Sequence, residues 1–161
     1  MALSESDRRL VELIAERDGG VLTTLKADGR PQLSNVSYHY YPGPAGESGS
    51  ITEFGGISEF GLIKVSITAD RAKYRNLVRD PRVSLHVTTP DFWAYAVAEA
   101  EAELSPVAAD PGDDTVRELV ELFRDVQGEH PDWDDYRRAM VADRRVVLRL
   151  PISRVYGLAG G

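Results

Sequence analysis

Residues 21–41 read VLTTLKADGRPQLSNVSYHYY, and this stretch decides the fold of the chain. Residues 21–25 are rich in side chains that favour strands. Asp28-Gly29 is a strong signal for a two-residue hairpin, because glycine tolerates the positive φ that a type I′ turn needs. Apolar and polar residues mostly alternate over 31–41, which predicts the return strand. The stretch therefore predicts an antiparallel hairpin as part of a larger sheet.

Further elements flank this hairpin on both sides. Apolar spacing predicts helices over 5–17, 70–78, 113–126 and 132–142, and strands over 62–68, 83–89, 95–104, 146–150 and 155–158. The strands and helices do not alternate regularly, and a Gly-x-Gly-x-x-Gly turn is absent, which disfavours a Rossmann fold. The element order predicts an α+β, mainly β fold, namely a small β-barrel with peripheral helices in one domain spanning 1–161.

Residues 43–60 interrupt this pattern. Residues 42–50 are rich in Gly, Pro and Ser, and the near-identical pentads ITEFG (51–55) and ISEFG (57–61) follow them. Two interpretations stay open: a surface insertion, or a lid whose Phe54 and Phe60 cover a ligand.

The composition excludes several kinds of site. The 161 residues include no Cys, which excludes disulfides, thiolate metal sites and a Cys nucleophile. The three His residues lack metal-ligand spacing, so no metal is expected. A Gly-x-Ser-x-Gly elbow is also absent. No catalytic residue is singled out by its type or spacing.

The net charge and the hydropathy pattern limit the partners. The formal charge of −7 argues against general nucleic-acid binding, which depends on phosphate neutralisation. No apolar run approaches the roughly 20 residues that span a membrane, and no export signal is recognisable, so a cytoplasmic location is expected.

Positive charge is nevertheless concentrated in one segment. Residues 64–84 hold six basic and two acidic residues, whereas residues 99–143 hold 14 of the 26 acidic residues. Arg71 and Lys73 fall in the expected first turn of a helix that follows a strand. Basic residues there oppose the helix dipole unless an anion compensates, which predicts a phosphate-like ligand. The alternative is a solvated helix face balanced by nearby acids. An anion site without a reactive side chain favours a cofactor that supplies the chemistry.

Several segments together resemble the pyridoxamine-phosphate-oxidase-like split-barrel flavoproteins, and within them the branch that binds the deazaflavin coenzyme F420. In order, they are GVLTTL (20–25), DGRPQLSNV (28–36), RAKYRNLVRDPRV (71–83), WAYAVAE (93–99), HPDWDDYR (130–137) and DRRVVLRLPISRVYG (143–157). The resemblance covers nearly the whole chain except residues 43–60.

The resemblance implies a homodimer of split β-barrels with a cofactor groove at each side of the interface. It implies hydride transfer between reduced F420 and a small conjugated organic substrate. The implied cofactor contacts are Arg71, Ala72, Lys73 and Ser66 near the phosphate and side chain, Gln32, Ser34 and Asn35 beside the ring system, and Trp93 and Tyr95 from the partner subunit.

Structural alternatives accompany these assignments. Gln32 and Asn35 are also suited to hydrogen bonding at a strand edge, Ser66 to an ordinary strand position, and Trp93 to interface packing. Arg144 and Arg145 are secondary candidates for contacting the anion. For the whole protein, an FMN-dependent oxidase or reductase and a non-catalytic F420 carrier stay open. A haem-binding protein is less well supported, because few axial ligands are available.

Overall fold

The computed structural model of the chain describes residues 3–43 and 58–160. Its helices are α1 (Glu5–Glu16), α2 (Ala72–Arg79), α3 (Asp114–Gln127) and α4 (Trp133–Ala142). Its strands are β1 (Gly19–Leu25), β2 (Pro31–Ser37), β3 (His39–Tyr41), β4 (Leu62–Thr68), β5 (Arg82–Thr88), β6 (Tyr95–Glu101), β7 (Glu103–Leu104) and β8 (Arg145–Leu158). Each helix expected from the sequence is present within two residues of its expected ends. In these two ranges, no helix is long and apolar enough to cross a membrane.

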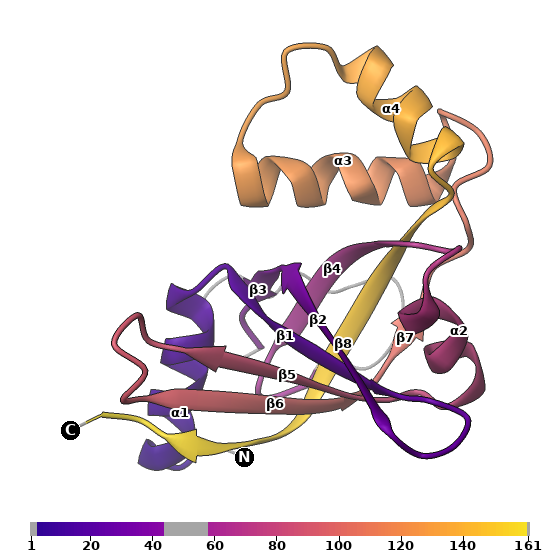
Figure 1. Cartoon of the computed structure of the whole chain (residues 1–161). Helices are drawn as coiled ribbons and strands as arrows, with labels where there is room; N and C mark the ends of the chain where they lie inside the picture. Colours follow the sequence, from indigo (N-terminus) through magenta and orange to yellow (C-terminus); the bar gives the residue numbers. More distant parts are fainter. Residues whose placement is uncertain (1–2, 44–57, 161) are drawn as a thin grey trace.

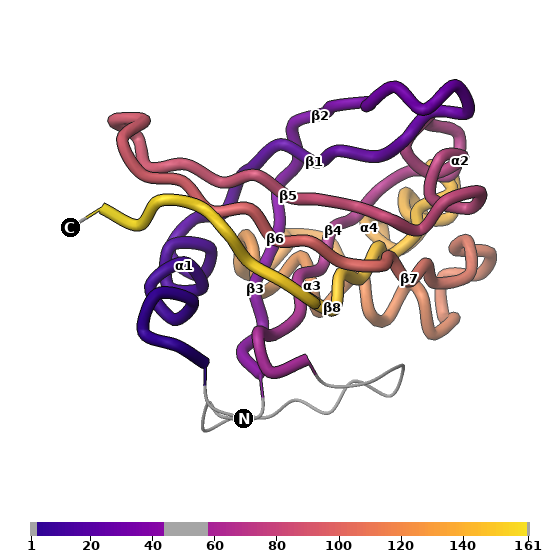
Figure 2. Tube along the Cα trace, turned by 90° about the horizontal axis from the view of Figure 1, so that it is seen from below, coloured from indigo at the N-terminus to yellow at the C-terminus, as the bar shows by residue number. Residues whose placement is uncertain are grey.

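One antiparallel sheet curls into an open barrel. The strand order is β2-β1-β5-β6-β8-β4-β3, with β7 paired to β8. Strand β8 pairs with β4 through its first half and with β6 through its second half, so it connects the two parts of the barrel (Figure 1). The view from below shows the same strand crossing from one part to the other (Figure 2). The predicted α+β, mainly β barrel with peripheral helices is confirmed.

The inside of the barrel is apolar because alternate side chains of each strand face it. In β4, Ile63, Val65 and Ile67 are buried, whereas the alternate side chains are half-buried on the outer face. Helix α1 packs its buried face, which includes Ile14, against the same core.

The return strand of the first hairpin is shorter than predicted. The sequence predicts one strand over 31–41, but β2 ends at Ser37 and pairs with β1, whereas β3 begins at His39 and pairs with β4. Tyr38 lies at the break and is 1% exposed. Its hydroxyl donates to the carbonyl oxygen of Ile14 at 2.5 Å, and its N–H donates to the carbonyl oxygen of Asp18 at 2.9 Å. Because apolar alternation continues through Tyr38, periodicity could not show that the pairing partner changes there.

The hairpin turn also differs from the prediction. A two-residue type I′ turn needs positive φ at both Asp28 and Gly29, but of the two only Gly29 has it, at +87°. Lys26 N–H donates to the carbonyl oxygen of Arg30, and Gly29 N–H donates to that of Lys26, both at 2.9 Å. The connection is therefore a longer turn, in which the Asp28 carboxylate accepts the N–H of Arg30 at 3.0 Å.

Two further strand boundaries need correction. The expected strand over 95–104 is interrupted at Ala102, which separates β6 from β7. The two strands expected over 146–150 and 155–158 form one continuous β8. Its register with β6 shifts opposite Glu99 and Ala100, where Ser153 is the extra residue of a bulge. The sequence pattern predicted a break between two strands here. Instead, the bulge lies where β8 has changed its partner from β4 to β6.

Residues 44–57 of the interrupting segment, Phe54 included, lie outside the described residues. Phe60 is described and packs half-buried against the barrel core. Its carbonyl oxygen accepts the hydroxyl of Tyr40 at 2.8 Å. Phe60 therefore supports the barrel wall in this structure.

We expect Tyr38→Phe to destabilise the fold, because the substitution removes the buried hydrogen bond between the first hairpin and α1. The free energy of unfolding should fall by about 1–2 kcal/mol, measured by urea denaturation. Tyr156→Phe, at a more exposed position of β8, serves as the control and should change little. Equal stability of the Tyr38→Phe variant and the wild type would contradict this role.

Candidate functional site

The α3–α4 hairpin lies over the outer face of β4 and β8 (Figure 1). A cavity of about 450 Å³ separates part of this hairpin from the sheet, and we call it the α3 cavity. Its polar lining consists of Asn35, Ser37, Ser66, Lys73, Gln127 and Arg145. Its apolar lining consists of Val36, Leu119, Leu122, Phe123, Val126, Tyr136 and Met140. None of these lining residues is acidic.

Two cations reach the cavity from neighbouring elements. Lys73 comes from the first turn of α2, directly after β4, and Arg145 comes from the first position of β8. Arg145 pairs with Thr68 at the end of β4, and its Nη1 lies 3.5 Å from both the carbonyl oxygen and the hydroxyl oxygen of Ser66. The β4–β8 pairing therefore brings together residues that lie far apart in the chain.

The Lys73 ammonium is in an unfavourable environment. Burial lowers its pKa below the ordinary value, and the positive charges of Arg71 and Arg145 lower it further. Each of these causes disfavours the charged form. A bound anion would favour the charged ammonium and so offset the effect of the two arginine charges on the pKa of Lys73.

Arg145 has an unsatisfied donor at the same place. Its Nε is buried and has no hydrogen-bond partner among the described residues. A carboxylate oxygen of Asp143 lies 4.0 Å away, which is beyond hydrogen-bond range. Buried polar groups almost always have a partner, so this N–H is a candidate ligand donor.

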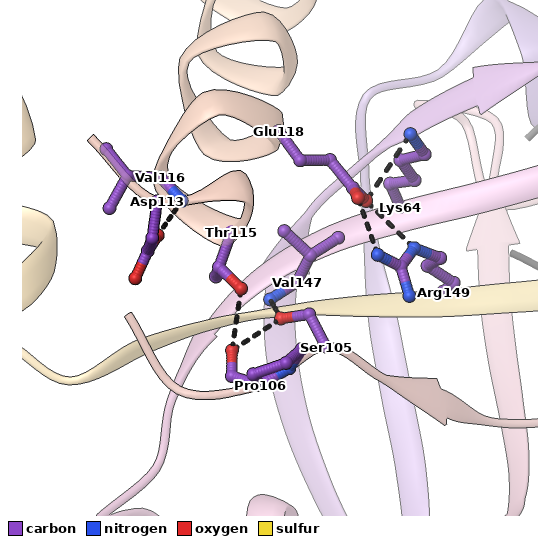
Figure 3. A network of polar contacts seen from close by, with 9 residues as sticks. All are labelled: Lys64, Ser105, Pro106, Asp113, Thr115, Val116, Glu118, Val147 and Arg149. Carbon is purple, nitrogen blue, oxygen red and sulfur yellow. Dashed lines mark hydrogen bonds and ion pairs between the residues drawn. The ribbon is translucent and has the colours of Figure 1, made fainter. Parts of the chain in front are cut away.

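A second pair of cations on the same sheet face has a carboxylate partner. Lys64 and Arg149 face each other across β4 and β8, and both bind the carboxylate of Glu118 from α3 (Figure 3). Arg149 donates to it at 2.9 and 2.5 Å, and the Lys64 ammonium lies 3.5 Å away. The chain thus neutralises these cations internally, whereas Lys73 and Arg145 have no carboxylate within the cavity lining.

The apolar wall of the cavity comes from the helical hairpin. Helix α3 contributes most of it, through Leu119, Leu122, Phe123 and Val126. Tyr136 of α4 fixes the hairpin by donating its hydroxyl to the carbonyl oxygen of Leu119 at 3.0 Å. Burial raises the pKa of Tyr136 to about 12, so the phenol stays protonated at neutral pH.

Three of the residues predicted from the sequence line the cavity, namely Asn35, Ser66 and Lys73. Gln32 and Ser34 lie on β2 with half-buried side chains outside the cavity lining. Ser34 nevertheless has a buried hydroxyl oxygen with no hydrogen-bond partner among the described residues.

The remaining predicted residues lie elsewhere. The helix predicted from residue 70 begins at Ala72, so Arg71 is its exposed N-cap and precedes the first turn. Trp93 belongs to the turn between β5 and β6 and is 81% exposed, beside α1. Tyr95 begins β6 and stacks on His86 with ring centroids 5.5 Å apart. Within one chain, neither Trp93 nor Tyr95 lines the α3 cavity.

Sequence reasoning understated Arg145 and missed the helical wall. Arg145 and Arg149 share one face of β8, and two cations at this spacing on an otherwise apolar strand were the available signal. The apolar stripe of α3 was recognisable, but its pattern is the same for a helix packed on a core and a helix facing a cavity.

The lining combines donors for an anion on one side with apolar side chains on the other. A ligand that fits both is a flat or apolar group with a covalently attached phosphate or carboxylate. The cavity volume lies within the range of small-molecule and cofactor sites. The buried, unpartnered Nε of Arg145 fits the anionic part of such a group.

Solved structures share the fold of this chain, although no protein-family model matches its sequence. An F420 reductase superposes with a TM-score of 0.62 at 22% identity, covering 90% of this chain and 94% of that chain. A haem-binding protein from Mycobacterium smegmatis gives 0.62 at 18% identity, covering 99% of this chain and 56% of that chain. A Listeria innocua protein named as a candidate pyridoxamine 5'-phosphate oxidase gives 0.57 at 16% identity, covering 97% and 100%. The chain therefore has the split β-barrel fold of the pyridoxamine phosphate oxidase-like proteins.

Proposed function

We propose that this chain is an oxidoreductase that binds coenzyme F420 in the α3 cavity and transfers a hydride between reduced F420 and a small conjugated organic substrate. The observation that carries the proposal is the pair of cations, Lys73 and Arg145, which face an apolar wall in a cavity lining that contains no carboxylate. The structural likeness to an F420 reductase supports the choice of cofactor.

The residues of the chain have distinct tasks in this proposal. Arg145 donates its unpartnered N–H to the cofactor's anionic group, Lys73 adds charge, and Ser66 offers a hydroxyl beside Arg145. The apolar side chains of α3 pack against the ring and exclude water. Arg71, exposed at the start of α2, lies where it can meet the outer part of a long anionic ligand. The cofactor supplies the hydride, and the protein supplies orientation and charge compensation.

Cofactor titration of matched variants tests the anion site. We expect Lys73→Ala and Arg145→Ala each to raise the Kd for F420 roughly 10- to 150-fold, since a hydrogen bond to a charged group contributes about 1.5–3 kcal/mol. Cofactor fluorescence at fixed ionic strength gives the Kd. Arg117→Ala removes one positive charge from an exposed position of α3, where Arg117 pairs with Asp114, and should leave the Kd unchanged. An unchanged Kd in both cavity variants would exclude this anion site.

A parallel titration with FMN separates the alternative functions. Preference for F420 together with oxidation of the reduced cofactor by an added conjugated substrate supports the proposal. Preference for FMN favours a flavin-dependent oxidase or reductase of the same fold. Binding of F420 without turnover of any tested substrate favours a carrier protein.

The same cations should reduce the stability of the ligand-free protein. Because burial and the neighbouring arginines disfavour charged Lys73, we expect Lys73→Met to raise the Tm of the ligand-free protein while it weakens cofactor binding. The pKa of Lys73 is lowered, so its cost is present while the side chain is charged and disappears as pH rises through that pKa. The Tm difference should therefore shrink at alkaline pH in thermal scans. Arg9→Met is the control, and a lower Tm for Lys73→Met would count against the unfavourable environment.

We also propose a homodimer whose interface completes the cofactor groove. Asn35 of the cavity ends a row of paired residues that crosses the outer sheet face through Val21, His86 and Val97 to Tyr156. Leu33, on the same face, is 59% exposed. This face offers a second copy an apolar surface that continues into the cavity.

Sedimentation velocity should show a species of twice the chain mass. Trp93→Ala should weaken F420 binding, because the proposed dimer places Trp93 at the groove of the partner. The neighbouring Phe92→Ala, which removes an equally exposed aromatic ring, serves as the control. A monomeric protein that binds F420 with a Kd unchanged by Trp93→Ala would contradict the contribution in trans.

A further inference from the structure

Glu118 connects three elements at one end of the α3 cavity. Its carboxylate belongs to α3 and binds Lys64 of β4 and Arg149 of β8 (Figure 3). The three side chains are only 7–13% exposed. The contact is therefore a buried ionic bridge between the helix and the sheet.

This bridge adjoins the cavity on both of its sides. On β4, Lys64 is followed on the same face by Ser66, which lines the cavity. On α3, Glu118 is followed by Leu119 and, one turn later, Leu122, which form the apolar wall. The bridge thus joins the wall of the cavity to the sheet that carries its polar side chains.

Packing alone holds only part of α3. Near the bridge, Val116, Leu119 and Val120 pack with Val147 of β8. Beyond Leu119, the cavity occupies the space between the helix and the strands, so direct packing on the sheet is interrupted there. Asp125, about two turns after Glu118, accepts the hydroxyl of Tyr41 at 2.5 Å. Two polar contacts from one side of the helix therefore hold α3 above the cavity.

We propose that Glu118 is a positioning residue that sets the distance between the apolar wall and the anion-binding side chains. This inference rests on the proposed function, because it assigns the wall to the ring of the cofactor and Lys73 with Arg145 to its anion. Without the carboxylate, Lys64 and Arg149 each lose a buried ion-pair partner, and the helix loses its attachment beside the cavity. The wall then contacts the ring poorly, whereas Lys73 and Arg145 remain in place.

Three possible roles of Glu118 predict different effects. A positioning role predicts that Glu118→Gln weakens the binding of ligands with an aromatic ring and leaves the binding of phosphates without one unchanged. A purely electrostatic role predicts that removing a negative charge near the anion site tightens every anionic ligand. A role in global stability alone predicts no change in affinity at a temperature where the variant is fully folded.

The experiment compares two probes on the wild type and the Glu118→Gln variant. The first probe is F420 or FMN, whichever binds the wild type more tightly, followed by fluorescence. The second is D-ribose 5-phosphate, which has a phosphate and no aromatic ring, followed by calorimetry. Circular dichroism confirms that both proteins are folded at the chosen temperature. We expect the Kd for the cofactor to rise at least about 10-fold and the Kd for the sugar phosphate to stay the same or fall.

Control variants isolate the position of the carboxylate. Glu121→Gln removes the same charge from an exposed position of α3 and should leave both affinities unchanged. Lys73→Ala should weaken the binding of both probes, because it removes one of the two cations of the anion site. If Glu118→Gln does not fold, Asp125→Ala removes the second contact of α3, and we expect the same selective loss to a smaller degree.

Unchanged or tighter binding of the cofactor by Glu118→Gln would overturn the positioning role, as would an equal loss for both probes. These outcomes would leave the proposed function intact. Failure of the wild type to bind either cofactor would instead refute the proposed function, and the inference would fall with it.

Discussion

Helix α3 covers a sheet face that carries cations, and the neutralisation of these cations determines the rest of the site. On the outer face of β4 and β8, Lys64 and Arg149 receive a carboxylate from the helix. Farther along the same strands, Arg145 receives none within hydrogen-bond distance of its Nε. Buried charges need partners, so the end with Lys64 and Arg149 is complete within the chain, whereas the other end keeps a buried N–H donor of Arg145 that would suit a ligand.

The sequence predicted those features that depend on neighbouring residues. Apolar spacing located β4 and α2, and the local excess of basic residues drew attention to Lys73, because a strand and the helix that follows it are adjacent in the chain. Strand pairing was harder to predict. The chain changes its partner strand at Tyr38, and β8 serves two partners around a bulge at Ser153. Neither change alters the apolar alternation, so neither could be detected from it.

The long-range part of the site depended on information that periodicity does not contain. Arg145 meets Ser66 only through the register of β4 with β8, which brings together positions far apart in the sequence. The stripe of α3 has one apolar pattern, yet Val116 packs on the sheet whereas Val126 faces the cavity. Trp93 shows the same limit, since its exposure in one chain does not identify what it contacts in an assembly.

The two sides of the cavity constrain the ligand more strongly together than separately. Cations alone would accept any small anion, and an apolar wall alone would accept any small hydrophobic molecule. Because Arg145 and Leu122 line one space of about 450 Å³, a ligand gains from both sides only if an anionic group and an apolar ring belong to one molecule. Such a ligand would also supply the negative charge that the cavity lining lacks. The arrangement therefore favours a ring-bearing anionic cofactor over a free phosphate or an uncharged substrate as the resident ligand of the cavity.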